Sequence, residues 1–86
     1  MNHFTTPQYW KFYQALPPEV KERADKAFAL LKENPSHPSL HFERKGKGWS
    51  ARISGGYRAL AKARPEGLVW MWIGSHDEYE RMIGSL

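Results

Sequence analysis

The sequence contains no cysteine and no long apolar segment, and both absences limit what the protein can be. Without cysteine there is no disulfide bond, no thiolate nucleophile and no sulfur-ligated metal, a composition compatible with a reducing compartment. No apolar run approaches the roughly 20 residues that cross a bilayer, and the first residues lack the basic and apolar regions of a signal peptide. We therefore expect a soluble protein of the cytoplasm.

Acidic residues are fewer than basic ones: the sequence has 9 Asp and Glu and 13 Lys and Arg, which gives a formal charge of +4. This excess suits a polyanionic partner, although it equally suits a purely solubilising role. Aromatic residues make up 14%, with four tryptophans, and they either fill a core or present a binding surface. The length of 86 residues indicates a single domain spanning 1–86.

Two helices are predicted in the N-terminal half. Thr6 is a suitable N-cap with Pro7 at the first helical position, and Pro18 opens a second helix that ends before Asn34-Pro35. Apolar residues recur at helical spacing in both segments. They are Tyr9, Phe12, Tyr13 and Leu16 in the first, and Val20, Ala24, Ala27, Phe28 and Leu31 in the second.

Four strands follow, joined by turns so short that neighbouring strands must be antiparallel. The predicted strands are Leu40–Arg44, Trp49–Ser54, Tyr57–Ala63 and Leu68–Ile73. Ser75 and Glu78 form a capping box that starts a short C-terminal helix. The expected fold is therefore α+β, with two N-terminal helices packed on a four-stranded antiparallel meander and a short C-terminal helix.

Loop length decides which side chains of neighbouring strands share a face. If residues 54–56 form a three-residue loop, Ile53 pairs with Tyr57, and Arg52 lies beside Arg58 on the face opposite the helices. A three-residue turn at 65–67 likewise pairs Arg64 with Leu68.

This register decides where the tryptophans of the fourth strand lie. It puts Val69, Met71 and Ile73 in the core, and it places Trp70 opposite Lys62 and Trp72 opposite Leu60 on the arginine face. The alternative is that the loops differ by one residue from those assumed. The tryptophans would then lie in the core and the arginines would be scattered surface charges.

Two stretches, GWSARISGGYRALAKA and LVWMWIGSHDEYERMI, carry a resemblance to a known family. The third predicted strand starts with Gly-Tyr-Arg, and Gly-x-His-Asp-x-Tyr leads into the last helix. In these motifs and in the order of its elements, the segment 18–83 resembles the RelE/ParE toxin superfamily of bacterial type II toxin–antitoxin systems. Members of that superfamily pack helices on an antiparallel sheet and usually begin with a strand. Residues 1–6 are short for such a strand.

The resemblance implies a function and partners. RelE-like members cleave mRNA on the ribosome without a metal, whereas ParE-like members poison DNA gyrase. We expect the toxin of a type II system, acting as an mRNA endoribonuclease that inhibits translation. The alternatives are a gyrase-directed toxin and an inactive member that only binds its antitoxin. The implied partners are a cognate antitoxin, which would lay a helix over exposed apolar and cationic surfaces, and the mRNA and ribosome; no cofactor is expected.

Metal-free cleavage needs a proton acceptor, a cation that stabilises the phosphorane and a proton donor. The resemblance assigns these catalytic roles to Arg58, Arg52, His76 and Tyr79, and phosphate or RNA binding to Lys45, Lys47, Lys62, Trp70 and Trp72. Simpler roles stay open, because His76 can be a solvated helix residue, Tyr79 a packing residue and the hairpin lysines solubilising charge. His37 and His41 are separated by Pro38 and lack a third ligand, so no metal site is predicted.

Overall fold

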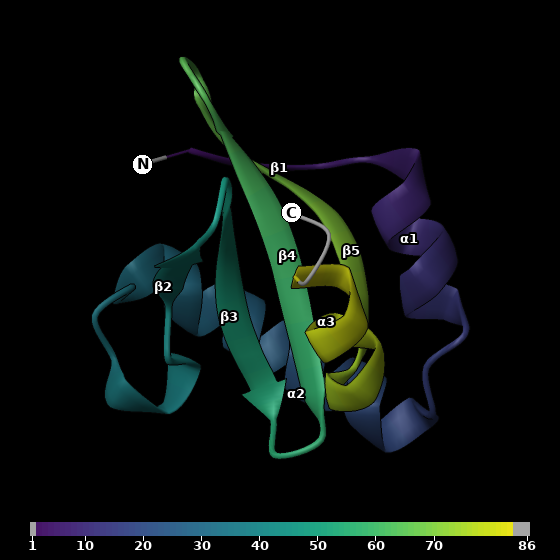
Figure 1. Ribbon diagram of the computed structural model, residues 1–86. Helices are drawn as coiled ribbons and strands as arrows, with labels where there is room; N and C mark the ends of the chain where they lie inside the picture. The colour runs from purple at the N-terminus through teal and green to yellow at the C-terminus, as the bar shows by residue number, and fades with distance from the viewer. Residues whose placement is uncertain (1, 84–86) are drawn as a thin grey trace.

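The computed structural model describes residues 2–83, which form a five-stranded sheet with helices on both faces (Figure 1). Sheet order is β1-β5-β4-β3-β2, with β1 parallel to β5 and all other neighbours antiparallel. The elements are β1 (His3–Thr5), α1 (Pro7–Gln14), α2 (Pro18–Glu33), a 3-10 turn (Pro38–Leu40), β2 (Glu43–Lys45), β3 (Gly48–Ser54), β4 (Tyr57–Arg64), β5 (Gly67–Ser75) and α3 (His76–Ile83). The α+β class is confirmed, but the sheet has a fifth, parallel strand that the sequence prediction omitted.

The helices begin where their capping residues predict. The Thr6 hydroxyl accepts a hydrogen bond from the Tyr9 amide at 3.0 Å, and Pro18 starts α2. At α3 the Ser75 hydroxyl donates to Glu78 Oε1 at 2.9 Å and accepts from the Glu78 amide at 3.2 Å. These bonds satisfy amides that a helix leaves unpaired, so each helix start is defined by local chemistry.

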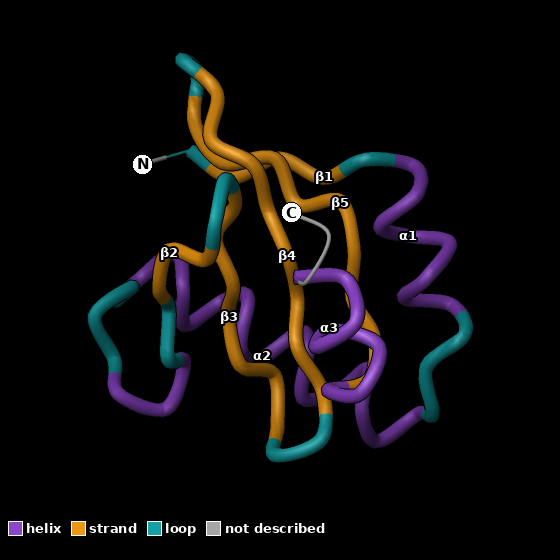
Figure 2. The backbone as a smooth tube through the Cα atoms, in the orientation of Figure 1, coloured by secondary structure: helices purple, strands orange, loops and turns teal. Residues whose placement is uncertain are grey.

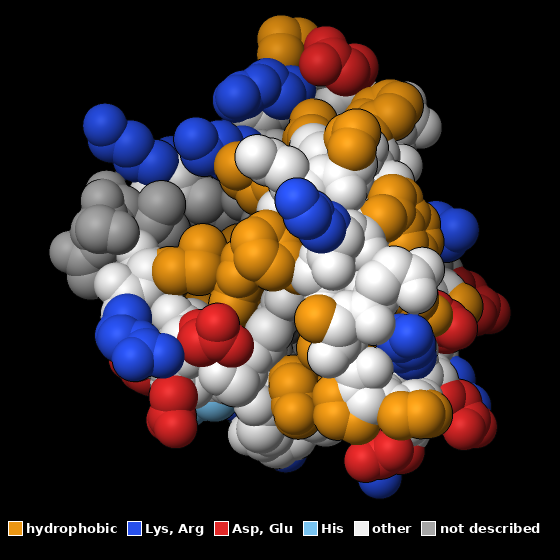
Figure 3. All heavy atoms as spheres, turned by 90° about the vertical axis from the view of Figure 1, so that its right-hand side faces the viewer, with side chains coloured by type: hydrophobic (Ala, Val, Ile, Leu, Met, Phe, Trp, Pro, Cys, Tyr) orange, Lys and Arg blue, Asp and Glu red, His pale blue; other side chains and the backbone are white. Residues whose placement is uncertain are grey.

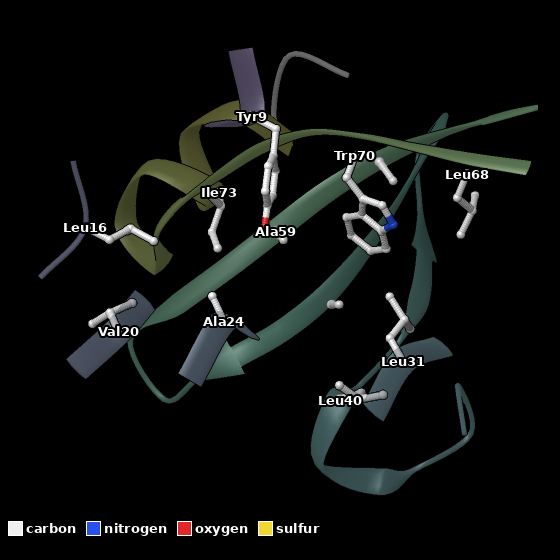
Figure 4. Packing of buried hydrophobic residues seen from close by; sticks show 12 residues of the cluster. Tyr9, Leu16, Val20, Ala24, Leu31, Leu40, Ala59, Leu68, Trp70 and Ile73 are labelled. Atoms are coloured by element: carbon white, nitrogen blue, oxygen red, sulfur yellow. The ribbon is translucent and has the colours of Figure 1, made fainter. Parts of the chain in front are cut away.

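The backbone trace shows how the helices lie against the sheet (Figure 2). The main core lies between the sheet and the helices α1 and α2 (Figure 4). Tyr9, Ala24 and Leu31 of these helices pack on the strands, where the small side chains of Ala51 and Ala59 allow the helices to approach closely. A second, smaller cluster lies on the opposite face under α3. It consists of Leu60, Trp72 and Tyr79, with Met82 and Ile83 packed against them.

The β3–β4 hairpin has the predicted faces but a different loop. Arg52 pairs with Arg58 and Ala51 with Ala59, as expected, whereas Ser54 rather than Ile53 pairs with Tyr57. The turn therefore has two residues, and a bulge at position 53 supplies the extra residue that keeps the two arginines paired.

The β4–β5 hairpin departs further from the prediction. Arg64 pairs with Gly67 rather than with Leu68, so Trp70 pairs with Ala61 and faces the main core. A register shift beyond Trp70 then brings Trp72 opposite Leu60, as predicted. The prediction that Trp70 lies on the same face as Arg52 and Arg58 was therefore wrong. The two-residue turn shifts the pairing by one residue, so the side chains of β5 before the bulge point to the opposite face from the one predicted, and after the bulge they point to the predicted face again. Val69 and Met71, which were assigned to the core, are only partly buried.

Strand β1 is held against β5 by both backbone and side chains. The Leu68 amide donates to the Asn2 carbonyl at 2.9 Å, and Gly67, with a φ of 146°, leaves no space for a Cβ atom beside that carbonyl. The Trp70 indole Nε1 donates to Nδ1 of His3 at 3.1 Å. Because this bond requires an unprotonated Nδ1, the docking of β1 depends on neutral His3.

Protonation of His3 is expected to weaken the fold. Burial, together with nearby positive charge that includes Lys32, lowers the pKa of His3 below its usual 6.5. The unfolded chain therefore binds the proton more tightly, so the contribution of His3 to stability is complete above about pH 6.5 and is lost as the pH falls below it. Urea unfolding at pH 7.5 and 5.5 measures the loss, and His3→Gln should remove this part of the pH dependence. An unchanged pH slope in His3→Gln would contradict the assignment.

Candidate functional site

Two arginines lie side by side where β3 and β4 meet their turn. The Arg58 Nη1 atom donates to the carbonyl oxygens of Ser54 at 2.7 Å and of Tyr57 at 2.9 Å, so the backbone of the turn fixes the guanidinium. Arg52 is its cross-strand neighbour. Within residues 2–83 neither arginine has a carboxylate within 4.0 Å. Opposed like charges destabilise a sheet, so a bound anion between these strands would be stabilising.

Arg52 also borders a hollow of about 200 Å³ that reaches the helix layer. Arg23 and Lys26 of α2 line the same hollow, so three cations surround it, although Lys26 is also paired with Glu22 at 3.3 Å. The sequence analysis assigned no role to these α2 residues, because a helix pattern alone does not place its polar face beside a particular strand residue.

His76 lies at the same end of the sheet as the arginines. Its amide donates to the Gly56 carbonyl at 2.8 Å, which ties the start of α3 to the β3–β4 turn. The ring is engaged, because Nε2 lies 3.0 Å from Glu80 Oε1, whereas Nδ1 is buried without a hydrogen-bond partner. Exchanging a proton with a ligand would require the ring to rotate away from Glu80. Glu80 had not been singled out from the sequence, although it lies four residues from His76 on one helix.

Tyr79 lies in the smaller core rather than on the surface. Its side chain is 4% exposed, packs with Leu60 and Trp72, and donates its hydroxyl to Ser50 Oγ at 3.3 Å. This is the position of a packing residue with a satisfied hydroxyl. A catalytic role for Tyr79 stays a prediction, and it requires α3 to move.

The predicted phosphate-binding lysines gather at the other end of the hairpin. Lys62 pairs with Gly48, four residues before Arg52 on β3, which separates the two groups by about 13 Å of strand. Lys45 is bound to Glu43 at 3.2 Å, and this hydrogen bond raises the pKa of Lys45. Lys47 is exposed in the preceding turn. The structure therefore divides the predicted site into an arginine group and a lysine group, with the small core under α3 between them.

Neither predicted RNA-binding tryptophan presents its ring to solvent. Trp70 is 3% exposed and lies in the main core, whereas Trp72 is buried in the cluster beneath α3. Base stacking by either ring would require rearrangement of the core around it.

The indole of Trp72 occupies the space above Gly74, which pairs with Arg58. A Cβ atom on Gly74 would lie 2.5 Å from Cζ2 of that indole. We expect Gly74→Ala to displace the buried ring and to lower the free energy of unfolding by about 1–3 kcal/mol, as overpacked cores do. Gly56→Ala is the matched control, since no heavy atom lies within 4 Å of the added Cβ. Equal stabilities of the two variants in urea unfolding would contradict this account.

The described residues include no cluster of three or more His, Asp or Glu side chains that could hold a metal ion. His37, considered above as a ligand, instead uses Nδ1 in hydrogen bonds with the amide and hydroxyl of Ser39, at 3.2 and 2.8 Å. No helix in residues 2–83 is long and apolar enough to cross a membrane.

The sequence matches no protein-family model and no curated protein, but the fold has clear relatives among solved structures. YafQ from E. coli strain BL21(DE3) superposes with a TM-score of 0.72 at 13% identity, over 91% of this chain and 96% of that one. The chain has the RelE/ParE toxin fold. Other structures with this RelE-like fold are a chain of the RelB–RelE antitoxin–toxin complex from Methanococcus jannaschii and the YoeB/ParE toxin from Agrobacterium tumefaciens.

These two relatives match nearly the whole RelE-like domain. The Methanococcus chain superposes with a TM-score of 0.70 at 10% identity, over 92% of this chain and 96% of that one. The Agrobacterium toxin gives 0.66 at 22% identity, over 88% and 99%. The resemblance noted in the sequence is therefore confirmed at the level of the fold, including the initial β1 strand, which residues 1–6 had seemed too short to form.

Proposed function

We propose that the protein is the toxin of a type II toxin–antitoxin system and that it cleaves mRNA on the ribosome. The observation that carries this proposal is the Arg52–Arg58 pair, two adjacent cations without a carboxylate partner in residues 2–83, on a RelE-like fold. Such a pair suits the anionic backbone of RNA. The antitoxin partner is supported by the RelB–RelE complex among the structural relatives.

In the proposed reaction the ribose 2′-hydroxyl attacks the adjacent phosphorus. A 2′-O–P bond forms, the P–O5′ bond breaks, and the products are a 2′,3′-cyclic phosphate and a 5′-hydroxyl. Arg58, held by two turn carbonyls, binds the phosphorane oxygens, and Arg52 binds the neighbouring phosphate. His76, once released from Glu80, takes one of the two proton-transfer roles, accepting the 2′-hydroxyl proton or protonating the leaving 5′-oxygen, and water takes the other. The lysine group at the other end of β3 binds RNA further along the strand.

A second candidate is a member without nuclease activity, directed at gyrase or limited to antitoxin binding. The enclosed hydroxyl of Tyr79 and the engaged ring of His76 favour it, because the Tyr79 hydroxyl is buried against Ser50, Nδ1 of His76 is buried, and Nε2 of His76 is paired with Glu80. Under this candidate the arginines bind an anionic group of the partner rather than a reacting phosphate.

Induced expression in bacteria separates the candidates. The nuclease proposal expects growth arrest together with new transcript ends that map within translated codons. A gyrase poison would instead produce DNA breaks with intact transcripts, and an antitoxin-binding member would leave growth unchanged. Co-expression of the neighbouring open reading frame should restore growth if that frame encodes the antitoxin.

A further inference from the structure

The hollow of about 200 Å³ beside Arg52 lies where the end of β3 meets α2, behind the sheet as drawn in Figure 1. Its walls carry three cations, Arg23 and Lys26 of α2 and Arg52 of β3. The α2 residues in its lining occupy positions 23, 26, 27 and 30, which is the spacing of one face of a helix. Both cations of α2 are therefore carried on the helix face that borders the hollow.

Acidic side chains do not balance the positive charge of this hollow. Among residues 2–83 no carboxylate lines it, and neither Arg23 nor Arg52 has a carboxylate within 4.0 Å. Lys26 is paired with Glu22 at 3.3 Å, but both side chains are exposed, and such pairs contribute little to stability. An anion that enters the hollow can therefore recruit Lys26 as a third cation.

The rest of the lining is apolar or small, which strengthens the attraction between the arginines and a bound anion. These residues are Ala27, Leu30, Ser39, Leu40 and Ile53. The face that carries α1 differs from this one, because apolar side chains extend over its middle with few charges among them (Figure 3). The cationic hollow is therefore a local feature of the α2 side.

Arg52 belongs both to this hollow and to the arginine pair on the sheet. It is the cross-strand neighbour of Arg58, and its Nη2 atom lies over the turn, 3.8 Å from the position of a Cβ atom added to Gly55. Two carbonyl oxygens hold the guanidinium of Arg58, whereas Arg52 has no hydrogen bond from its side chain within the described residues. Arg52 is therefore the free member of the pair, able to bind an anion on either side.

We propose that this hollow binds a small free phosphate compound, inorganic phosphate or a diphosphate, and that the bound anion draws Arg52 away from Arg58. Arg23 and Arg52 donate to the phosphate oxygens, and Lys26 joins them when it leaves Glu22. Occupancy of the hollow then weakens the binding of RNA between Arg52 and Arg58, and bound RNA weakens phosphate binding by the same factor. Only this effect on RNA rests on the proposed function, because the hollow itself does not include Arg58.

RNA is a poorer occupant of the hollow than a small phosphate compound. Sites for single-stranded RNA combine a row of cations with aromatic rings on which the bases stack. Here the cations surround one hollow rather than follow a groove, and no aromatic side chain is among the lining residues. The hollow therefore offers contacts to a phosphate group but none to a base.

The binding test titrates pyrophosphate into ¹⁵N-labelled protein at pH 7.5, with sodium chloride adjusted to keep the ionic strength constant. Amide shifts should concentrate at Ser39 and Ile53, and the side-chain Nε–H signal of Arg52 should shift with the same saturation curve. Arg23→Ala should weaken binding by about 5-fold or more, as for the loss of a partly screened charged donor. Lys32→Ala is the matched control, since Lys32 lies on the same helix outside the lining, over the ring of Phe28, and should change binding less than twofold.

A second pair of variants tests the competition for Lys26. Glu22→Gln frees Lys26 and should strengthen pyrophosphate binding by about 2-fold to 3-fold. Glu19→Gln makes the same change of charge on α2 at a residue that neither lines the hollow nor pairs with a cation within the described residues, so its effect should be smaller.

Absence of saturable shifts at about 20 mM pyrophosphate, or equal losses from Arg23→Ala and Lys32→Ala, would overturn the proposal, because the anion would then only screen surface charge. An RNA oligonucleotide that shifted the Ser39 and Ile53 amides and displaced pyrophosphate would also overturn it and would assign the hollow to RNA.

The effect on the arginine pair is measured with a labelled RNA that has deoxyribose at the cleavage position. Pyrophosphate should raise the Kd of this RNA several-fold for the wild type but not for Arg23→Ala. The same rise in both proteins would mean direct competition at Arg58 and would overturn the coupling. Because pyrophosphate binding is measured without RNA, failure of the RNA to bind would count against the nuclease proposal alone.

Discussion

Replacing Arg58 with alanine is expected to reduce ribosome-dependent mRNA cleavage by about 100-fold or more, because removal of one preorganised donor to a developing charge typically costs that much. The guanidinium is held in place by the Ser54 and Tyr57 carbonyls, so the alanine variant loses both the charge and its fixed orientation. Cleavage is measured by primer extension on mRNA bound to purified ribosomes, alongside growth after induction. If Arg58→Ala arrests growth as the wild type does, the nuclease proposal fails.

Arg64→Ala provides the control for this experiment. Arg64 is on the same strand and donates to the Ala63 carbonyl at 3.2 Å, but it lies at the exposed end of β4 away from Arg52. Its loss should change cleavage less than threefold. Arg58→Lys distinguishes charge from geometry, since an ammonium keeps the charge but does not reproduce the planar donor arrangement. Urea unfolding of all three variants shows whether a loss of activity reflects a loss of fold.

Trp70→Ala is expected to lower the free energy of unfolding by about 3–5 kcal/mol, as for other large-to-small core substitutions. Trp70 is 3% exposed, stacks beside His3 and donates to its Nδ1, so the substitution creates a cavity and releases β1. A loss of this size is a large fraction of the 5–15 kcal/mol that typically stabilises a domain. Urea unfolding at pH 7.5, followed by circular dichroism, measures the change.

Two further tryptophan variants make this result specific. Trp10→Ala removes a ring that is 43% exposed and whose Nε1 donates to Thr5 Oγ1 at 2.9 Å, so about 1 kcal/mol is expected, well below the loss for Trp70→Ala. Trp70→Phe keeps most of the packing but removes the indole donor to His3, so about 1 kcal/mol is expected for the lost hydrogen bond. A Trp70→Ala protein as stable as Trp10→Ala would mean that Trp70 faces solvent and that its pairing with Ala61 is wrong.

Local signals predicted the elements of the fold well. Thr6-Pro7, Pro18 and the Ser75–Glu78 capping box each act within one helical turn, and all three helices start where these residues indicate. The two short hairpins also predicted antiparallel neighbours correctly. Strand β1 was missed because three residues carry no periodicity, and its pairing with β5 depends on residues more than 60 positions away.

Side-chain orientation was harder to predict, because each one-residue irregularity reverses the facing of a strand. In the first hairpin a shorter turn and a bulge compensate, so Arg52 and Arg58 remain paired. In the second the bulge comes after Trp70, which therefore faces the core. The contacts of the predicted site residues likewise depend on the tertiary structure. The i,i+4 spacing of His76 and Glu80 is compatible with their contact, but no sequence spacing shows that Tyr79 is enclosed over Ser50 or that Arg23 shares a hollow with Arg52.

The parallel pairing of β1 with β5 has a consequence for how the chain folds during its own synthesis. Residues 3–5 find their partners only when residues 68–70 have been made. At roughly 5–20 residues per second the strand waits about 3–13 s for them. During that time α1 and α2 lack Trp70, Ile73 and the rest of β5, and Arg58 lacks its neighbour Gly74. A ribosome that stops between residues 64 and 75 therefore releases a chain that carries both arginines but lacks a complete β5, so incomplete translation products of this protein cannot complete the main core.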